Sequence, residues 1–406
     1  MNPLQLTHFT ATSCIGRGLG PTLQALREQR GGLAPCTFER AELQTWVGAV
    51  DGVDDEPVRA DLRAFDCRNH RLAQLALRQD GFADAVAAAA TRYGATRIGV
   101  FLGTSTSGIL ETEQAYRRRD PQSGALPVDF HYAQTHNCYA LAAFVRAYFA
   151  LGGPAASISS ACSSGAKVFG SARRMIEAGL IDAAVVGGVD SLCLTTLYGF
   201  NSLELLSRER CRPFDVARKG ISIGEAAAFA LLERPRQASG GDHAILLLGI
   251  GESSDAHHMS SPHPEGLGAR RAIEGALATA GLAAADIDYI NLHGTATPGN
   301  DTAESLAVNA LFDGTPSSST KGATGHTLGA AGALEAVISA LALRHQFVPA
   351  GIGTTEPDPA LNLHYVLESR SAPLRAVLSN SFGFGGTNCS LILGRSDITH
   401  EGSTGR

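Results

Sequence analysis

The most constraining feature of this sequence is a recurring order of segments: an apolar strand, a turn of small residues, then a helix. Residues 155–159 lead through a Ser- and Gly-rich turn into a helix expected over 163–178. Residues 289–292 lead through His293-Gly294 towards a helix expected over 302–312. The 46 glycines and the 6% of aromatic residues suit many tight strand-to-helix turns. Alternating strands and helices predict a layered α/β fold.

The chain is also expected to consist of two halves of similar style. Its 406 residues exceed what one small core organises. The polar, linker-like segment 235–242 separates a half at 1–234 from a half at 243–396, and the polar tail 397–406 is expected to be disordered. No residue-level repeat is visible, so the similarity predicts a degenerate duplication.

The remaining elements are expected from hydrophobic periodicity and from breaker residues. In the first half these are a helix at 71–93 broken near Gly81, a helix at 140–150, and strands at 98–102, 183–186 and 226–232. In the second half they are strands at 245–250 and 376–378 and helices at 269–280 and 328–345.

Charge and cysteine usage exclude several classes of function. A net charge of -6 disfavours general affinity for nucleic acid or for an anionic membrane. No apolar run approaches the roughly 18–20 residues of a spanning helix, and no signal peptide is recognisable, so a cytoplasmic protein without a membrane span is expected. The eight cysteines form no CxxC pair, which predicts neither a metal site nor a disulfide framework.

Cys162 is the first candidate for chemistry. It lies in Ser-Ile-Ser-Ser-Ala-Cys-Ser-Ser-Gly-Ala, where a strand meets the start of a helix. The helix dipole and unpaired N–H groups there are expected to lower the pKa of the thiol and to favour a nucleophilic thiolate. The alternative is a buried structural thiol, because free cysteines are often buried.

Two histidines and a glycine-rich loop are the other candidates. His293 and His326 each lie in a Gly-rich turn ahead of a helix, and Asp301 with Glu304 has the spacing of a capping box. Residues 380–388 form a Gly-rich loop after a strand, which suits an oxyanion or a phosphate. Nucleotide-binding motifs are absent. The adjacent pair His257-His258 favours a structural role over metal binding.

Four separated motifs together resemble the elongating β-ketoacyl-[acyl-carrier-protein] synthases of the thiolase superfamily. They are Ala-Cys162-Ser-Ser-Gly, His293-Gly-Thr-Ala-Thr-Pro-Gly-Asn-Asp, Lys321-Gly-Ala-Thr-Gly-His326 and Asn-Ser-Phe382-Gly-Phe-Gly-Gly-Thr-Asn. The resemblance spans roughly residues 4 to 393. It implies a five-layered αβαβα fold built from two duplicated halves. It also implies decarboxylative Claisen condensation of an acyl thioester with malonyl carrier protein.

The resemblance also implies a role for each matching residue. Cys162 is the expected nucleophile, and His293 and His326 are expected to hold the malonyl thioester oxygen during decarboxylation. The other expected roles are site orientation by Lys321 with Glu335, an oxyanion hole from the N–H groups of Cys162 and Phe382, a gate at Phe382-Gly383, and pantetheine binding by Thr295 and Thr297. No resident cofactor is expected, because the phosphopantetheine belongs to the carrier-protein substrate.

The resemblance implies partners as well. An acyl carrier protein is acidic as a class, and Arg63, Arg68 and Arg71 are expected to form its basic docking patch. The alternative for these arginines is an ordinary solvated helix face. A homodimer, or a heterodimer with a ketosynthase-like subunit, is expected.

Three alternatives are weighed against the active elongating enzyme. A non-catalytic chain-length factor would lack the reactive cysteine. A biosynthetic thiolase would carry a second catalytic cysteine; Cys389 follows the Gly-rich loop, but a core thiol on the closing strand is expected there. The initiating synthases have Asn where His326 stands.

Two features of the sequence resemble the synthases of specialised clusters, such as those of aryl polyenes. They are the segment Gly-Ile-Ser-Ile-Gly224-Glu225 and a general shift towards Ala.

Overall fold

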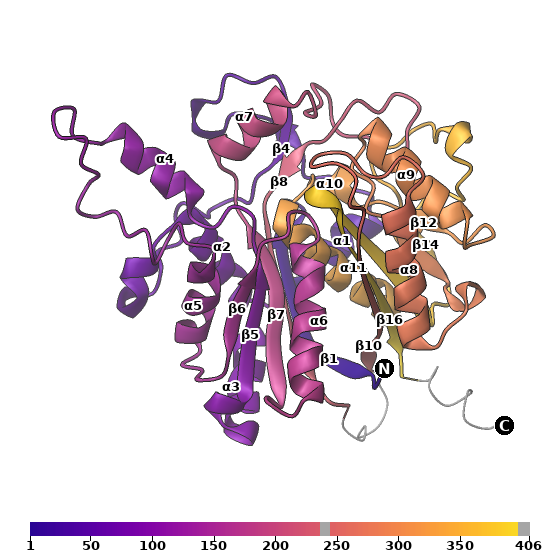
Figure 1. Ribbon diagram of the computed structural model, residues 1–406, viewed down its shortest axis with the longest axis horizontal. Coiled ribbons are helices and arrows are strands. Elements are labelled where there is room, and N and C mark those ends of the chain that lie inside the picture. The colour runs from indigo at the N-terminus through magenta and orange to yellow at the C-terminus, as the bar shows by residue number, and fades with distance from the viewer. Residues whose placement is uncertain (236–243, 397–406) are drawn as a thin grey trace.

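Five strands from each half form one continuous hydrogen-bonded path in the computed structural model, which describes residues 1–235 and 244–396 (Figure 1). The first half contributes β1 (Leu4–Ser13), β9 (Ala226–Glu233), β7 (Ala183–Asp190), β5 (Ile98–Gly103) and β6 (Ala155–Ile158). The second half contributes β10 (Ile245–Ser254), β16 (Thr387–Arg395), β15 (Ala376–Gly383), β11 (Tyr289–Asn291) and β12 (Ser317–Ser318).

The two sets of strands have the same topology. In the order given, the first two pairings of each set are antiparallel and the last two are parallel. The sets meet at β1 and β10, where the paired residues are Leu4 with Leu247 and Gln5 with Leu246. The predicted fold of two similar α/β halves is therefore confirmed.

Helices complete five layers. The central layer holds α6 (Ser164–Glu177) and α11 (Ala331–His345), whose apolar side chains share one core with inward-facing residues of both sets of strands. The outer layer on the first set holds α2 (Arg68–Leu77), α3 (Phe82–Tyr93) and α5 (Tyr139–Tyr148). The outer layer on the second set holds α8 (Leu267–Ala280) and α9 (Pro298–Asn309).

Shorter elements surround this body. They are α1 (Leu19–Arg27), α4 (Ile109–Arg117), α7 (Leu194–Ser202), α10 (Lys321–Thr324), the 3₁₀ turns η2 (Ala60–Phe65), η5 (Leu328–Ala330) and η7 (Phe384–Gly386), and the short strands β4 (Trp46–Gly48) and β8 (Ile223–Gly224). Two further short sheets involve β3 (Ala34–Pro35), β13 (Phe347–Val348) and β14 (Arg370–Ser371), and β2 (Gly16–Arg17) pairs with β1. In Figure 1, α4 projects from the body of the molecule.

Most expected elements are present with shifted ends. Gly81, at a φ of 66°, separates α2 from α3, as predicted. The strand expected at 376–378 extends to Gly383 because it pairs with β16 along its whole length. The helix expected at 302–312 begins earlier, at Pro298. The predicted linker, apart from Pro235, and the predicted tail lie outside the described residues.

The central helix corrects one expectation about apolar runs. Residues Leu328–His345 are long and apolar enough to cross a membrane by length and composition, with a mean hydropathy of 1.2. However, 89% of this window is buried inside the protein. A helix that is apolar on all sides is also what a central core layer requires. The composition of α11 is therefore explained by its place between the two sets of strands.

Candidate active site

The turns that carry the candidate residues follow the carboxyl ends of three strands, β6, β11 and β12. Cys162 lies between β6 and α6, and His326 lies between β12 and α11, so the two residues occupy corresponding turns of the two halves. His293 follows β11, which is parallel to β12. The carboxyl ends of parallel strands are a general location for ligand sites in α/β proteins.

Cys162 is buried with a raised pKa. The residue is 6% exposed, and Ala161 before it has a φ of 53°, a conformation uncommon for residues other than glycine. Burial raises the pKa of the Cys162 thiol to about 11, although the charge of Lys321 and a hydrogen bond from the backbone N–H of Phe384 act in the opposite direction. The prediction of a lowered pKa is therefore wrong for the free protein, because desolvation outweighs the helix terminus.

His326 is the direct neighbour of this thiol. Its Nε2 atom lies 2.9 Å from the Cys162 Sγ atom. Its backbone is fixed by β8 and the residue before it: the His326 N–H donates to Ser222, and the His326 carbonyl accepts from Gly224. Burial, and then the charge of Lys321, hold the pKa of His326 well below its usual range. A neutral imidazole is therefore in hydrogen-bond contact with the thiol.

The ammonium of Lys321 determines which nitrogen of His293 carries the proton. Lys321 Nζ contacts Glu335 Oε1, lies 2.5 Å from the His293 carbonyl oxygen and lies 3.3 Å from His293 Nδ1. An ammonium has three donors, and these three acceptors satisfy them. His293 Nδ1 is then an acceptor, so the proton of the neutral ring is on Nε2. Burial, and then Lys321 and His326, keep the pKa of His293 well below its usual range.

The Nε2–H of His293 therefore faces the same space as Cys162 and His326. The two imidazole rings are perpendicular, with centroids 5.4 Å apart. Burial raises the pKa of Glu335 to about 7 despite its contact with Lys321. Lys321 and Glu335 thus lie on the Nδ1 side of His293, away from the thiol, and orient its ring as the resemblance implies.

Glu304 is a functional candidate that the sequence analysis misinterpreted. Its carboxylate accepts the backbone N–H groups of His293 and Gly294, each at 2.8 Å, and the side-chain amide of Asn380. Burial raises the pKa of Glu304 to about 7. The capping-box spacing with Asp301 pointed to a helix start, but Thr297 is the N-cap residue of α9. The Glu304 carboxylate therefore holds the His293 turn in place and does not cap the helix.

In the glycine-rich loop, the backbone donor near Cys162 lies two residues later than predicted, at Phe384 instead of Phe382. Phe382 still lies in the β15–β16 ladder, paired with Asn388, and its ring centroid is 6.0 Å from that of His293. The turn begins after it, and the backbone N–H of Phe384 is the donor that reaches Cys162. Oxyanion donation was expected from Phe382, whose backbone belongs to the sheet, whereas the structure places the N–H of Phe384 at the sulfur. Gly383 lines the cavity between them.

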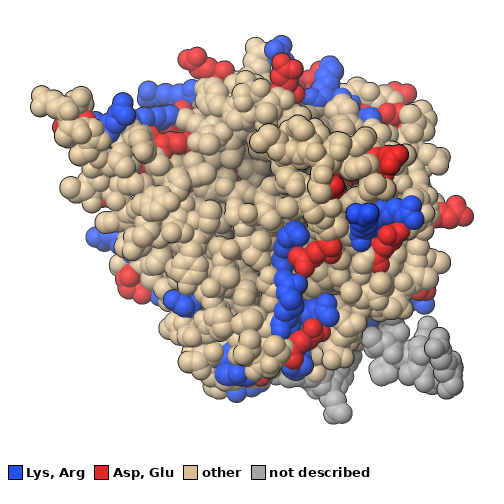
Figure 2. All heavy atoms as spheres, in the orientation of Figure 1, with Lys and Arg blue, Asp and Glu red and all other residues tan. Residues whose placement is uncertain are grey.

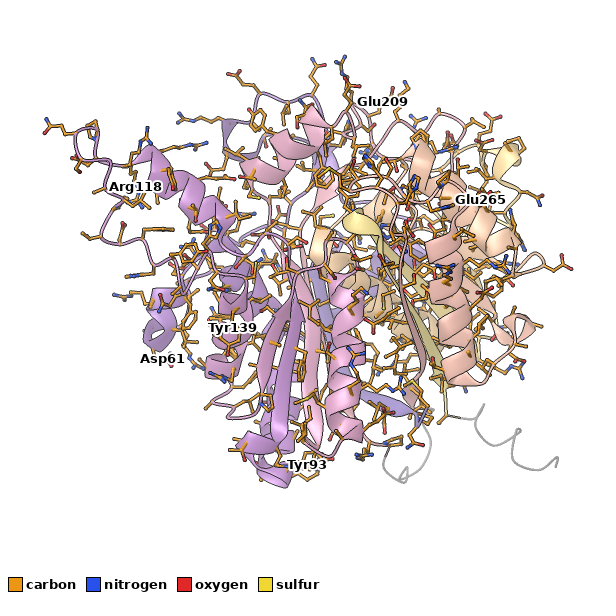
Figure 3. The ribbon with its side chains drawn as sticks, viewed as in Figure 1. Asp61, Tyr93, Arg118, Tyr139, Glu209 and Glu265 are labelled. Carbon is orange, nitrogen blue, oxygen red and sulfur yellow. The ribbon has the colours of Figure 1, made fainter. Side chains whose placement is uncertain are left out.

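A cavity of about 320 Å³ opens beside the three catalytic candidates. Thr295 and Thr297 line it, with their hydroxyl oxygens 2.9 Å apart. Leu205 and Pro264 also line it. Figure 3 shows Glu209 near the upper edge of the molecule and Glu265 on its right side. A mostly apolar cleft with a few polar groups is typical of a small-molecule site.

Metal binding is less well supported than acid–base chemistry. The potential ligand atoms of Cys162, His293 and His326 lie within 4.8 Å of one another. The contact with Lys321 leaves His293 Nε2 protonated, so this atom presents a donor rather than a lone pair. His257 and His258 belong to no group of three such ligands among the described residues. His257 instead contacts the ring of His263.

Two of the three predicted docking arginines are engaged within the chain. Arg68 is 5% exposed and binds Glu225 and Asp54, so it contributes no exposed charge; its prediction as a docking residue is wrong. Arg71 forms a bidentate pair with Asp66. Arg63 is exposed in η2. Figure 3 shows Asp61, in the same turn, well away from Glu209 at the upper edge.

The raised pKa of Cys162 gives a direct prediction for the free protein. The rate of alkylation by iodoacetamide should rise with pH towards a midpoint near 11, because only the thiolate reacts and burial opposes its formation. Peptide mass spectrometry after proteolysis would follow Cys162 separately from the exposed Cys138, which serves as an internal reference for the reagent. A midpoint below pH 8 would show that the site stabilises the thiolate.

Comparison with known proteins agrees with this geometry. The family models described as "Beta-ketoacyl synthase, N-terminal domain" and "Beta-ketoacyl synthase, C-terminal domain" match residues 37–238 and 244–355. The chain is 33% identical to 3-oxoacyl-[acyl-carrier-protein] synthase 2 of Coxiella burnetii, over 96% of this chain and 98% of that protein.

Two solved structures have the same fold over nearly the whole chain. One is a chain of the ketosynthase ApeO in complex with its chain length factor ApeC from Xenorhabdus doucetiae, with 39% identity, coverage of 97% of this chain and 98% of that chain, and a TM-score of 0.85. The other is a beta-ketoacyl synthase from Burkholderia phymatum, with 30% identity, coverage of 97% and 100%, and a TM-score of 0.86. With Cys162, His293 and His326 assembled as a catalytic triad, this chain belongs to the β-ketoacyl synthase family and is a condensing 3-oxoacyl-[acyl-carrier-protein] synthase of the thiolase-like fold.

Proposed function

We propose that this chain is the catalytic subunit of a ketosynthase that extends unsaturated or aryl acyl chains in a specialised pathway, such as aryl polyene biosynthesis. The observation that carries the proposal is the 39% identity, over 97% of the chain, to a chain of the ApeO–ApeC complex. The intact triad separates this chain from a chain length factor without a reactive cysteine. The Ala-rich segment at β8 and β9 is also similar to synthases of specialised clusters.

The first half-reaction loads the thiol. Cys162 Sγ attacks the carbonyl carbon of an acyl thioester on the phosphopantetheine of a carrier protein. His326, with Nε2 at 2.9 Å, is positioned to receive the thiol proton and to keep it on Nε2, while the departing pantetheine thiolate takes a proton from solvent. The N–H groups of Cys162 and Phe384 hold the oxyanion, and Phe384, whose ring contacts Phe200 at the cavity, acts as the gate with Gly383.

The second half-reaction forms the carbon–carbon bond. The malonyl thioester oxygen accepts hydrogen bonds from the Nε2–H of His293 and from His326, and the electrons of the breaking bond to CO₂ move into the enolate. The enolate carbon then attacks the acyl–Cys162 thioester and expels the Cys162 thiolate, which takes its proton back from His326. Lys321 and Glu335 hold the His293 tautomer, and Thr295 and Thr297 hold the pantetheine amide groups.

The subunit partner is proposed to cover the α4 side of the molecule. β6 is the terminal strand of the path, so one of its edges is free for pairing. Beside the α4–α5 segment, Tyr116 is 55%, Val128 100% and Tyr132 56% exposed. Figure 3 shows Arg118 and Tyr139 on this same projecting side. A second ketosynthase-like subunit would bury these apolar groups.

Carrier-protein docking is proposed at the cavity mouth rather than at η2. Arg208 and Arg210 are exposed and follow Leu205, which lines the cavity. Neighbouring Arg212 and Lys219 both pair with Glu209. The Arg210 guanidinium lies 4.6 Å from the centroid of the Trp46 ring, so Arg208 offers the more available charge. Figure 2 shows small blue and red groups interspersed along the top of the molecule, and a column of blue groups with red ones beside it lower in the view. The acidic carrier protein would therefore need a local contact.

The expected compartment is the cytoplasm. All eight cysteines are free thiols in the structure. Free thiols are typical of reducing compartments, where disulfides rarely persist.

The proposal is tested by condensation assays with defined carrier-protein thioesters. The chain alone, and co-purified with a ketosynthase-like subunit that lacks the cysteine, would be given malonyl carrier protein with saturated, polyenoyl or arylalkenoyl carrier protein. Intact mass spectrometry would report β-ketoacyl products, with Cys162→Ala as the control. The expected result is preferential extension of the unsaturated and aryl chains by the heterodimer. Equal or better extension of saturated chains by the chain alone would overturn the specialised role.

A further inference from the structure

A buried carboxylate at the end of β7 contacts the turns of both catalytic partners. Asp190 is completely buried. Its Oδ1 atom accepts hydrogen bonds from the hydroxyls of Thr104 and Thr106 and from the N–H groups of Ser105 and Thr106, all at 2.8 Å. Its Oδ2 atom accepts from the N–H of Gly329, at 2.5 Å. All five groups are donors, so an ionised, acceptor-only carboxylate satisfies them together.

One side of this network leads to the nucleophile. Ser105, whose N–H binds Asp190, donates its hydroxyl to the carbonyl of Ala161 at 3.4 Å. Ala161 immediately precedes Cys162 and has the left-handed φ of 53° that orients the turn. The hydrogen bond to Ala161 therefore links the position of the Cys162 backbone to the loop that Asp190 organises.

The other side leads to the histidine. Gly329 belongs to η5, three residues after His326, and this turn comes from the second half of the chain. A Cβ atom on Gly329 would lie 2.8 Å from Asp190 Oδ2 and from Ser105 N, so the close approach needs a glycine. Asp190 thus connects the first-half loop to the second-half turn through one carboxylate.

This connection lies close to another contact between the halves, the bridge between Ile223 of β8 and His326. Among the described residues, the long strands of the two halves pair at Leu4–Leu247 and Gln5–Leu246. That pairing is at the lower edge of the molecule in Figure 1, whereas α10, beside the catalytic turns, is at the upper side. The 2.9 Å contact between Cys162 and His326 also crosses from one half to the other.

We propose that Asp190 is a positioning residue that sets the contact between Cys162 and His326 by binding the Ser105 and Gly329 amides across the two halves. Asp190 touches neither the thiol nor the imidazole in this arrangement; it acts through the two turns. The proposal rests on the triad already described and concerns how its members are held together.

The test is a double-mutant cycle on the reactivity of Cys162. In Asp190→Asn, an amide group replaces one carboxylate oxygen, so either the Gly329 or the Ser105–Thr106 donors face another donor. The alkylation rate of Cys162 at a fixed pH should fall about tenfold, the scale of losing one hydrogen bond to a charged sulfur. In the His326→Ala background the same substitution should change the rate less than twofold, because the contact is already absent.

Additional variants separate positioning from general stability. Asp182→Asn, just before β7 and paired with Arg97 at the surface, is the matched control and should leave the rate within twofold of the wild-type value. Thr104→Val removes one donor to Asp190 without changing the shape of the side chain, and should slow alkylation in the same direction if Asp190→Asn fails to fold. For folded Asp190→Asn, kcat for malonyl decarboxylation should fall while KM changes less than twofold.

An equal effect of Asp190→Asn with and without His326 would overturn the proposal. Unchanged alkylation in a folded variant would do the same. Because alkylation needs no carrier protein, either result is distinguishable from a failure of the proposed acyl specificity.

Discussion

Cys162→Ala should abolish acylation and condensation while malonyl decarboxylation continues, and His326→Ala should impair decarboxylation while acylation of Cys162 continues. Without the thiol no acyl-enzyme forms, but the Nε2–H of His293 and the ring of His326 can still hold the malonyl oxygen. Without His326, decarboxylation should fall by at least ~10²-fold, the scale of removing one preorganised oxyanion donor. Acylation should continue about tenfold more slowly, because the thiol loses its hydrogen-bond partner.

Intact mass would detect the acyl-enzyme, and release of labelled CO₂ would measure decarboxylation. Since His326 is the immediate neighbour of a thiol with a raised pKa, a competing possibility is that it serves only as the base for loading. If His326→Ala abolished acylation and left decarboxylation intact, the role assigned to the two histidines in the second half-reaction would be wrong.

Arg68→Ala should destabilise the protein by about 3–5 kcal/mol, the usual cost of leaving one member of a buried ion pair without its partner. Arg68 Nε and Nη2 bind the fully buried Glu225 at 2.9 and 2.6 Å. Glu225 also accepts the N–H groups of Val50 and Leu192, so it joins three segments of the first half. Removing the guanidinium would leave this carboxylate with backbone donors alone.

Urea unfolding at a fixed protein concentration would measure the change in the free energy of unfolding. Arg71→Ala is the matched control, because the Arg71–Asp66 pair is partly exposed and should contribute at most about 1 kcal/mol. If Arg68→Ala kept full stability and instead raised the KM for the carrier protein, Arg68 would be a docking residue after all.

The sequence was most informative where a short motif determines local chemistry. The turns of Cys162, His293 and His326 were recognisable because each combines a reactive side chain with small residues between a strand and a helix. The layered fold followed from the alternation of strands and helices, and the strand topology repeats in both halves.

The features that could not be predicted from the sequence depend on contacts between residues far apart in the chain. Asp190 sits in Gly-Gly-Val-Asp, with no local sign that its carboxylate binds an amide 139 residues away. Arg68 appeared available because its helix position says nothing of Glu225, which is 157 residues away. The pKa of Cys162 likewise depends on burial by both halves, whereas the helix terminus is visible locally. The Phe384 donor needed the register of β15 and β16.

The matching turns of Cys162 and His326 bear on the ancestry of the chemistry. If the two halves descend from one duplicated unit, an ancestral pair of identical units would have presented the same residue from both turns. Such a site could hold two sulfurs or two imidazoles, but not one of each. A sulfur that carries the acyl group and an imidazole that handles protons could face each other only after fusion let the copies diverge. Carbon–carbon bond formation would then depend on the divergence of these two turns after the duplication.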